Sequence, residues 1–308
     1  MTPVNSHTSA ANWTREPERG NVWLLRLMVW LSLRLGRPLG RLLLYPVSLY
    51  FLLFARRAGQ ASRDYLRRVL PHPPRLTDRF RHIFSFASTV HDRLYLLNDR
   101  FDLFDIRIVG AEHLPAQGGA LLMGAHLGSF EVMRSLARQR KLQVAMLMYE
   151  ENARMVNSML AAINPLAETD IIPLGKMDSM LQAVNRLETG HFVGMLADRT
   201  LGGDTARACN FLGAPAELPL GPFRMAAMLK HPVIFMTGLY LGGNRYEIHF
   251  EALADFSATP RSEREAAIHA AQDRYVQKLA AFCRHAPYNW FNFFDFWHTG
   301  KSAEETDT

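Results

Sequence analysis

A histidine and a glutamate flank a glycine-serine turn in the first half of the chain, and these residue types suit acid–base chemistry. In "LLMGAHLGSFEVMRSLARQ", residues 121–139, His126 ends an apolar run and Glu131 begins an amphipathic stretch. A carboxylate in a first helical turn can reach back to one imidazole nitrogen, which would leave the other nitrogen as a general base. Backbone N–H groups near Gly128 and Ser129 would be free at the helix start to stabilise an oxyanion.

The spacing of the pair is weak support by itself. A chain with 12 histidines and 29 acidic residues is expected to contain such a match by chance, although only His126 has an acidic residue five positions later. The alternative is a histidine bonded to a carbonyl and a glutamate that interacts with the helix dipole. Ser129 as a nucleophile is disfavoured, because "HLGSFE" lacks the G-x-S-x-G elbow of hydrolases.

The surrounding pattern predicts the elements that position this pair. Strand-like and helix-like stretches alternate from about residue 104, which predicts an α/β fold with a mostly parallel sheet covered by helices and a final antiparallel element. His126 follows the strand "ALLMGA" and Asp198 follows the strand "FVGMLA". Ligands bind at the carboxyl ends of parallel strands, so we expect both loops to face one crevice. The expected strands are "FDIRIVG", "GALLMGA", "LQVAMLMY", "DIIPLG", "HFVGMLAD", "PVIFMTGLYL" and "RYEIHFEAL"; the expected helices are 129–140, 152–163, 176–189, 221–230 and 261–284, with a long loop before 221.

Composition excludes several other functions. The sequence has no P-loop and no G-x-G-x-x-G after a strand, and its two cysteines, Cys209 and Cys283, lack metal-ligand spacing. We therefore expect no metal, nucleotide or other cofactor.

Residues 1–110 carry a net charge of +9 and the remainder carries −3. This distribution fits an anionic membrane surface better than a nucleic-acid partner.

The amino-terminal region predicts a membrane-associated helical segment. Residues 22–55 are almost entirely apolar, and Gly36 and Pro38 divide them into two helical pieces. The 14 uncharged residues of 42–55 are short for a span, which needs about 20. We expect an in-plane anchor or a short tilted span rather than a signal peptide, with the arginines that follow on the cytoplasmic side. A buried helical hairpin in a soluble protein is the alternative.

A proline-rich stretch, "RVLPHPPRLTDRF" at residues 68–80, predicts a linker, after which Thr77 is expected to cap a helix over 78–98. The predicted organisation is a polar tail over 1–21, a membrane-anchoring segment over 22–70, an α/β domain over 71–300 and a polar tail over 301–308.

Four stretches resemble a known family. "GAHLGSFE", "MYEENARMVNSML", "ADRTLGGD" and "FLGAPAELPLGPFRMAAMLKHPVI" occur in the order found in the late acyltransferases of lipid A biosynthesis, within the lysophospholipid acyltransferase superfamily. The resemblance implies an enzyme at the cytoplasmic face of the bacterial inner membrane. It implies acyl transfer from an acyl carrier protein to a lipid hydroxyl, without metal or cofactor.

The resemblance also implies roles for individual residues. His126 matches the catalytic base and Glu131 its partner carboxylate, while Arg154 matches a basic position thought to contact the anionic donor or acceptor. Asp198 and Arg199 match a loop beside the active site. Surface charge pairing for Arg154 and loop capping for Asp198 are the structural alternatives.

The segment from Phe211 to Pro222 resembles an acceptor-site turn of that family. Gly213 and Pro215 would shape its backbone, and Pro219 would open the following helix. A purely structural turn is the alternative for this segment.

The carboxyl-terminal region departs from the family. Its members usually close with a Trp-x-His-Arg-Arg type of basic ending, whereas this chain has "APYNWFNFFDFWHTG" at residues 286–300. The aromatic residues predict a different acceptor surface, a lid against the membrane, or an element that plugs the core. Two other functions stay open: an acyl-CoA-dependent acyltransferase of lysophospholipids or glycerolipids, and a non-catalytic lipid-binding protein.

Overall fold

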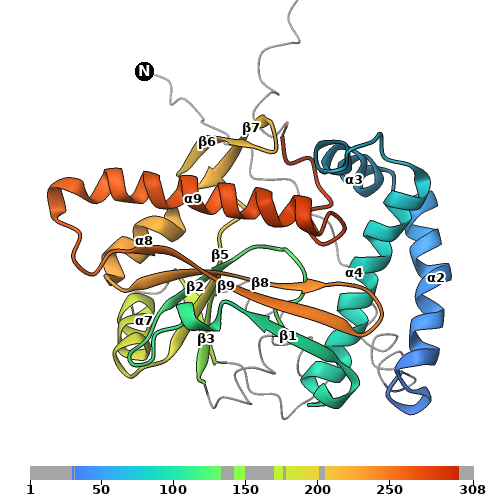
Figure 1. Cartoon of the computed structure of the whole chain (residues 1–308), viewed down its shortest axis with the longest axis horizontal. Helices are drawn as coiled ribbons and strands as arrows, with labels where there is room; N and C mark the ends of the chain where they lie inside the picture. Colours follow the sequence, from blue (N-terminus) through green and yellow to red (C-terminus); the bar gives the residue numbers. More distant parts are fainter. Residues whose placement is uncertain are drawn as a thin grey trace, which may run out of the picture.

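The computed structural model describes residues 30, 32–132, 142–149, 170–175, 178–200 and 205–297. Helices and strands both occur from β1 onwards and build a mostly parallel sheet with helices around it, and this confirms the predicted α/β class (Figure 1). The helices are α2 (Arg37–Phe54), α3 (Arg56–Val69), α4 (Leu76–Leu97), α7 (Ser179–Glu188), α8 (Gly221–Leu229) and α9 (Arg264–His285), with short 3-10 turns η2 (Phe101–Leu103), η3 (Ala111–His113) and η4 (Arg261–Glu263). The strands are β1 (Asp105–Val109), β2 (Leu121–Gly124), β3 (Val144–Tyr149), β4 (Asp170–Leu174), β5 (Phe192–Leu196), β6 (Ala206–Phe211), β7 (Ala214–Pro219), β8 (Pro232–Tyr240) and β9 (Arg245–Asp255).

The main sheet has seven strands in the order β1-β9-β8-β2-β5-β3-β4. Every neighbouring pair is parallel except β8–β9, so the sheet is mostly parallel with a late antiparallel pair, as predicted. All four residues of β2 are buried, because both faces of the strand are covered. Leu121 and Met123 join one apolar cluster and Leu122 joins another, which places a core on each face of the sheet.

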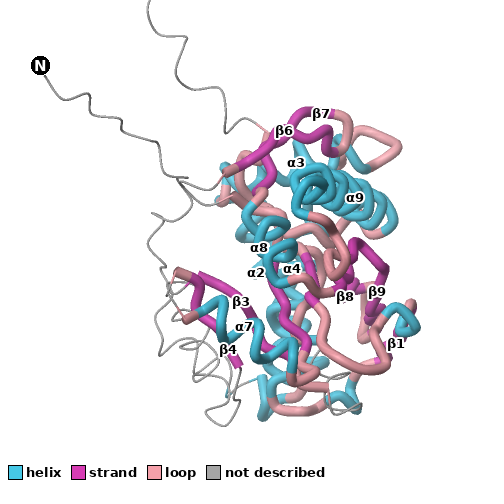
Figure 2. Tube along the Cα trace, turned by 90° about the vertical axis from the view of Figure 1, so that its left-hand side faces the viewer, coloured by secondary structure: helices cyan, strands magenta, loops and turns pink. Residues whose placement is uncertain are grey.

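The helices lie around this sheet in groups. In Figure 1, α9 lies along one side with α8 beneath it, and the two helices are in contact. The helices α2 and α4 lie side by side at the right of the same view, and α3 contacts both. Figure 2 shows β3, β4 and α7 together on another side of the molecule.

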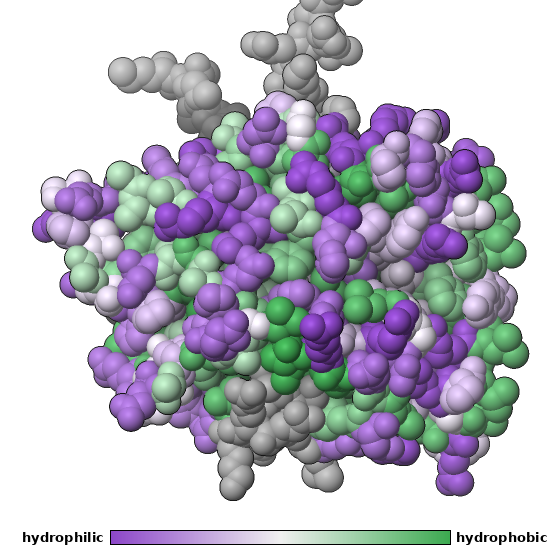
Figure 3. Space-filling view, in the orientation of Figure 1, coloured by the Kyte–Doolittle hydropathy of each residue, from purple (hydrophilic) through white to green (hydrophobic). Residues whose placement is uncertain are grey.

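Helix α2 buries a narrow stripe of two small residues and one leucine and turns most of its large apolar residues outward. Gly36 has a φ of 80°, and α2 begins directly after it, so the predicted break between two helical pieces is present. Gly40, Leu44 and Ser48 are buried, and a Cβ built on Gly40 would lie 2.2 Å from His91 Nε2 of α4. The apolar colouring at the right margin of Figure 3 falls where α2 lies in Figure 1. The outward side chains are Leu39, Leu42, Leu43, Tyr45, Val47, Leu49, Tyr50, Phe51, Leu53 and Phe54.

None of the described helices alone is both long enough and apolar enough to cross a bilayer. Helices α2 and α3 meet the criterion only when taken together, and the chain bends by 93° between them.

Three local predictions were wrong. The loop expected before residue 221 contains the hairpin β6–β7, whose two-residue turn, Leu212 and Gly213, has φ values of 52° and 84°. Both values are positive, as a type I′ hairpin turn requires.

Thr77 lies inside α4, which begins at Leu76; Asp78 Oδ2 accepts the backbone N–H of Arg75 instead. Pro219 ends β7, and α8 begins two residues later. The predicted helix 152–163 and most of 129–140 lie outside the described residues.

Candidate active site

The carboxyl ends of two adjacent strands bring His126 and Asp198 together. His126 lies two residues after β2, Asp198 lies two residues after β5, and these strands pair in parallel. His126 Nδ1 is 2.8 Å from Asp198 Oδ1, and the backbone N–H of His126 donates to Asp198 Oδ2 at 3.1 Å. The parallel pairing of β2 and β5 therefore positions a histidine-carboxylate pair that is 72 residues apart in sequence.

The chemistry of Asp198 determines the tautomer of His126. An ionised carboxylate only accepts hydrogen bonds, so His126 Nδ1 carries a proton and Nε2 holds the free lone pair. The His126 side chain is 32% exposed, whereas the Asp198 side chain is 0% exposed. No described residue donates to Nε2, so this nitrogen is available to a substrate.

Electrostatics keep the histidine neutral and the aspartate ionised. Burial lowers the pKa of His126, the charge of Asp198 opposes that change, and Arg199 adds to it. Burial alone would raise the pKa of Asp198, but the histidine, its hydrogen bonds and Arg199 outweigh burial and hold this pKa well below its usual range. A neutral imidazole with a free Nε2 is the protonation state that a general base needs.

Glu131 does not make the contact that the sequence predicted. Its Oε1 atom lies 2.6 Å from Arg93 Nε of α4, and its Oε2 atom accepts a hydrogen bond from Ser129 Oγ at 3.3 Å. The carboxylate on the imidazole is that of Asp198. The expectation favoured a neighbour close in sequence, whereas the sheet provides a partner from another strand.

The predicted oxyanion donors are already occupied. Gly128 N donates to Asn289 O at 2.8 Å, and Ser129 N donates to Gly238 O at 2.7 Å. Gly128 has a φ of 75°, and a Cβ there would lie 2.0 Å from Gly238 O, so glycine is required for this close approach. These N–H groups hold the loop against its neighbours and are not free for an oxyanion.

The other predicted site residues lie in different places. Arg199 is next to the pair; its Nε donates to Asn292 Oδ1 at 2.6 Å and its Nη2 donates to Phe291 O at 3.1 Å. Gly213 is in the turn of the β6–β7 hairpin, and Pro215 pairs with Asn210 in that hairpin. Arg154 lies outside the described residues.

The hairpin connects to the site through one aromatic side chain. Phe211, fully buried, lies 5.2 Å from Trp290 between ring centroids. Trp290 Nε1 in turn donates to Asp198 Oδ2 at 3.0 Å. The segment that resembles an acceptor-site turn thus packs beneath the histidine-carboxylate pair.

Residues near the carboxyl terminus complete the site, and the sequence did not identify them. Besides Trp290, Asn292 Nδ2 donates to Asp198 Oδ2 at 3.1 Å. Both side chains are buried, so the aromatic segment belongs to the core, which was one of the predicted alternatives. Apart from a single β-bridge between Trp290 and Leu127, the segment forms neither helix nor strand. Polar residues within an otherwise aromatic run, Asn289 and Asn292, were the available signal.

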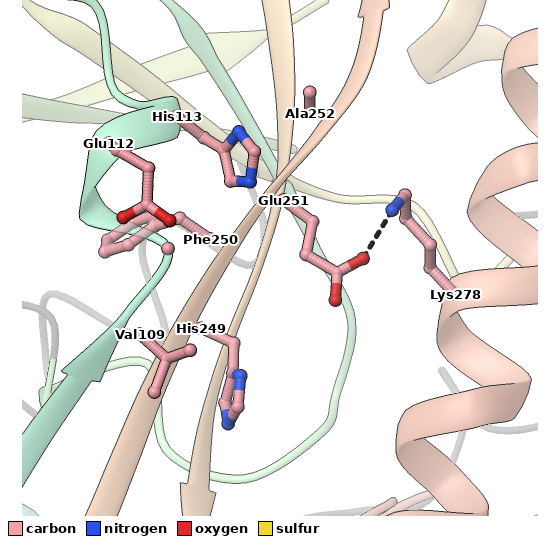
Figure 4. A pocket seen from close by; sticks show the side chains of 9 residues that line it. Val109, Glu112, His113, His249, Phe250, Glu251, Ala252 and Lys278 are labelled. Atoms are coloured by element: carbon pink, nitrogen blue, oxygen red, sulfur yellow. Dashed lines mark hydrogen bonds and ion pairs between the residues drawn. The ribbon is translucent and has the colours of Figure 1, made fainter.

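A cavity lies away from this pair. Figure 4 shows it between the end of β1 with the turn η3, strand β9, and Lys278 of α9, which pairs with Glu251. Its volume is about 300 Å³, and none of the predicted site residues lines it. Within the described ranges, no group of three or more side chains could hold a metal ion.

One of three comparisons with known proteins gives a family match, and it covers most of the chain. Residues 10–299 match the family described as bacterial lipid A biosynthesis acyltransferase. Among solved structures, the 1-acyl-sn-glycerophosphate (LPA) acyltransferase PlsC from Thermotoga maritima is similar over 84% of this chain and 96% of its own, at 13% identity and a TM-score of 0.38. A search of curated proteins found no match. The family match includes His126, Asp198, Trp290 and Asn292.

Proposed function

The chain belongs to the bacterial lipid A biosynthesis acyltransferases, and from this premise we propose that it moves a fatty acyl group from an acyl carrier protein thioester to a hydroxyl of a lipid acceptor. It is an acyltransferase. The observation that carries the proposal is the contact between His126 Nδ1 and Asp198 Oδ1 at the carboxyl ends of adjacent parallel strands. That arrangement leaves His126 Nε2 as the base.

The proposed reaction needs one base and one activated donor. His126 Nε2 takes the proton of the acceptor hydroxyl as its oxygen attacks the thioester carbonyl, and a tetrahedral oxyanion forms. When this intermediate collapses, the carbon–sulfur bond breaks and the imidazolium returns its proton to the departing thiolate. Asp198 keeps the imidazole oriented and stabilises its positive charge between the two steps. A thioester is already activated, so this sequence uses neither a metal nor a nucleotide.

Charge supports an acidic donor partner. Residues 1–110 contain 17 arginines and no lysine. Arg56, Arg57, Arg63 and Arg67 of α3 are exposed, and α3 reaches the candidate site through Tyr65, whose ring centroid is 5.0 Å from that of Trp290. An exposed basic face near the site would attract an acidic carrier protein.

The outward apolar face of α2 supports a membrane location. A helix that buries Gly40 and Ser48 while it exposes Leu42, Leu53 and Phe54 has its apolar side toward the surroundings. Contiguous exposed apolar surface of this kind marks a membrane or protein contact. We place the enzyme at the cytoplasmic face of the bacterial inner membrane, with α2 in the lipid and the arginines of α3 beside anionic headgroups.

Acyl transfer with defined donors tests the proposal. Purified full-length protein is incubated with acyl carrier protein thioesters or acyl-CoA, together with a lipid A precursor, a lysophospholipid or another hydroxylated lipid, and products are identified by mass spectrometry. We expect transfer from the carrier protein to a lipid hydroxyl. The same activity should be lost in His126→Ala, which must retain the melting temperature of the wild type.

Other outcomes point to the alternatives. Transfer from acyl-CoA alone to a lysophospholipid would support the glycerolipid enzyme. A co-purifying lipid that is never converted, with affinity unaffected by His126→Ala, would support a binding protein. Full activity in folded His126→Ala would remove the proposed mechanism.

A further inference from the structure

We propose that Trp290 and Asn292 are positioning residues for the reaction: they fix the Asp198 carboxylate so that one of its oxygens is reserved for His126. The inference rests on the proposed function, and it gives the carboxyl-terminal segment a role in positioning the Asp198 carboxylate. Asp198 Oδ2 accepts three hydrogen bonds, from the backbone N–H of His126, from Trp290 Nε1 and from Asn292 Nδ2, at 3.0 to 3.1 Å. Asp198 Oδ1 is then left to the His126 ring at 2.8 Å.

Arg199 determines the orientation of the Asn292 amide. A guanidinium only donates hydrogen bonds, so the atom of Asn292 that faces Arg199 Nε at 2.6 Å is the carbonyl oxygen. The amide nitrogen therefore faces Asp198, which only accepts. The buried Asn292 therefore links Arg199 to Asp198, with its amide oxygen on the arginine and its amide nitrogen on the aspartate.

Backbone contacts hold the same segment beside the histidine. Phe291 N donates to His126 O at 2.8 Å, and Arg199 Nη2 donates to Phe291 O at 3.1 Å. On the other side of the segment, a backbone carbonyl only accepts, so His82 Nε2 donates to Trp290 O at 2.8 Å. The segment is thus held by the loops that follow β2 and β5 and by α4.

Packing makes the indole a rigid donor. Trp290 is 0% exposed, and its ring lies 5.0 Å from Tyr65, 5.2 Å from Phe211 and 4.8 Å from Phe296 between centroids. A side chain enclosed on several sides cannot turn its N–H away from Asp198. The donor is therefore present before substrate binds.

These donors have a defined effect on the base. Hydrogen bonds to Oδ2 spread the negative charge of Asp198, which weakens its attraction for a proton on the imidazole. Loss of either donor concentrates charge on the carboxylate and favours the imidazolium. The charged groups that act on His126 are Asp198 and Arg199, and neither is removed by a change at Trp290 or Asn292.

The test compares three variants of the full-length protein. Trp290→Phe keeps the aromatic ring and removes one donor to Asp198, and Asn292→Ala removes the other. Trp297→Phe is the matched control, because Trp297 belongs to the same aromatic cluster but donates its N–H to Phe211 O at 3.3 Å. The pKa of His126 is read from its ring resonances by NMR, assigned by comparison with His126→Gln, and kcat and KM are measured across pH.

We expect the pKa of His126 to rise by about one pH unit in Trp290→Phe and in Asn292→Ala, with the acidic limb of the kcat/KM profile shifted upward equally. We expect kcat to fall about tenfold while KM stays near the wild-type value. Trp297→Phe should leave the pKa unchanged. If either folded variant titrates as Trp297→Phe does, the positioning role is wrong.

Failure of this inference is separable from failure of the proposed function. The NMR titration needs no substrate, so a shift of the His126 pKa would establish the positioning even if His126→Ala were fully active. An unshifted pKa together with an inactive His126→Ala would retain the base and reject the role of Trp290 and Asn292. If Trp290→Phe does not fold, Asn292→Ala alone decides, since it leaves the aromatic packing intact.

Discussion

Asp198 Oδ1 lies 2.8 Å from His126 Nδ1, whereas Glu131, only five residues from the histidine, is bound to Arg93. The two carboxylates therefore occupy different electrostatic environments. Asp198 is 0% exposed and contacts the ring, and Glu131 is 15% exposed and pairs with an arginine of α4. The His126 ring is therefore oriented by its nonlocal partner, Asp198.

The first prediction separates the two carboxylates. In Asp198→Asn the imidazolium loses its charged partner, so the pKa of His126 should fall by about one pH unit or more and kcat should fall by about 100-fold to 1,000-fold. In Glu131→Gln the pKa of His126 should stay at the wild-type value. NMR titration of the ring with parallel kinetics measures both. A pKa change in Glu131→Gln equal to that in Asp198→Asn would contradict the assignment.

The second prediction concerns the pH dependence of stability through His82. Burial lowers the pKa of His82 from 6.5 to about 4, with the carbonyl of Trp290 opposing the change, and Ser62 Oγ donates to its Nδ1. Above pH 6.5 both folded and unfolded chains leave the ring neutral. Below it the unfolded chain binds the proton first, so the free energy of unfolding falls until about pH 4, by on the order of 3 kcal/mol.

The control for His82 is a variant that does not titrate. His82→Gln should be less stable than the wild type at pH 7.5. Its free energy of unfolding should fall less between pH 6.5 and pH 4 than that of the wild type. Urea unfolding at each pH measures the difference. Parallel curves for the two proteins would show that His82 is already protonated or is exposed.

The third prediction concerns the outward face of α2. Leu42 and Leu53 are each 62% exposed, so a double change to glutamate should leave the melting temperature nearly unchanged. Binding to vesicles that contain phosphatidylglycerol should fall at least about tenfold, because two apolar side chains leave the lipid and two like charges enter. Co-sedimentation measures the bound fraction. Leu181→Glu on α7, where the side chain is 71% exposed, is the control and should bind as the wild type does.

The fourth prediction concerns the contact between α2 and α4. A Cβ on Gly40 would lie 2.2 Å from His91 Nε2, so Gly40→Ala should force the helices apart and lower the free energy of unfolding by about 1–3 kcal/mol. Gly221→Ala at the start of α8 meets no atom within 4 Å and should stay within about 0.5 kcal/mol of the wild type. Equal stabilities for both variants would mean that α2 does not pack as described.

The strand order explains which parts of the site could be predicted. Alternating apolar runs identified the strands before His126 and Asp198, and the rule for parallel sheets placed both at one edge. The adjacency of β2 and β5 brings the two side chains into contact, and it cannot be predicted from the residues of either strand. Glu131 was favoured because local spacing is visible in a sequence and cross-strand pairing is not.

The loop donors failed for a related reason. A helix start has free N–H groups only if nothing else accepts from them, and Gly238 and Asn289, more than 100 residues away, do accept. The β6–β7 hairpin was missed because its turn, Leu212-Gly213, lacks the usual Asn-Gly or Asp-Gly signal. The carboxyl-terminal donors Trp290 and Asn292 were missed because they lie in a mostly aromatic run, and aromatic residues indicate core packing rather than hydrogen bonding to a site.

The position of Trp290 and Asn292 in the chain has a consequence for biosynthesis. Domains generally form from the amino terminus as they leave the ribosome. Strands β2 and β5 emerge long before residues 289–292, so a nascent chain can bring His126 and Asp198 to one sheet edge while Asp198 Oδ2 still lacks its two side-chain donors. The complete set of donors is assembled only after almost the whole of the described chain has been synthesised. Partly made chains would therefore lack the two side-chain donors that fix Asp198, and these contacts form last in synthesis.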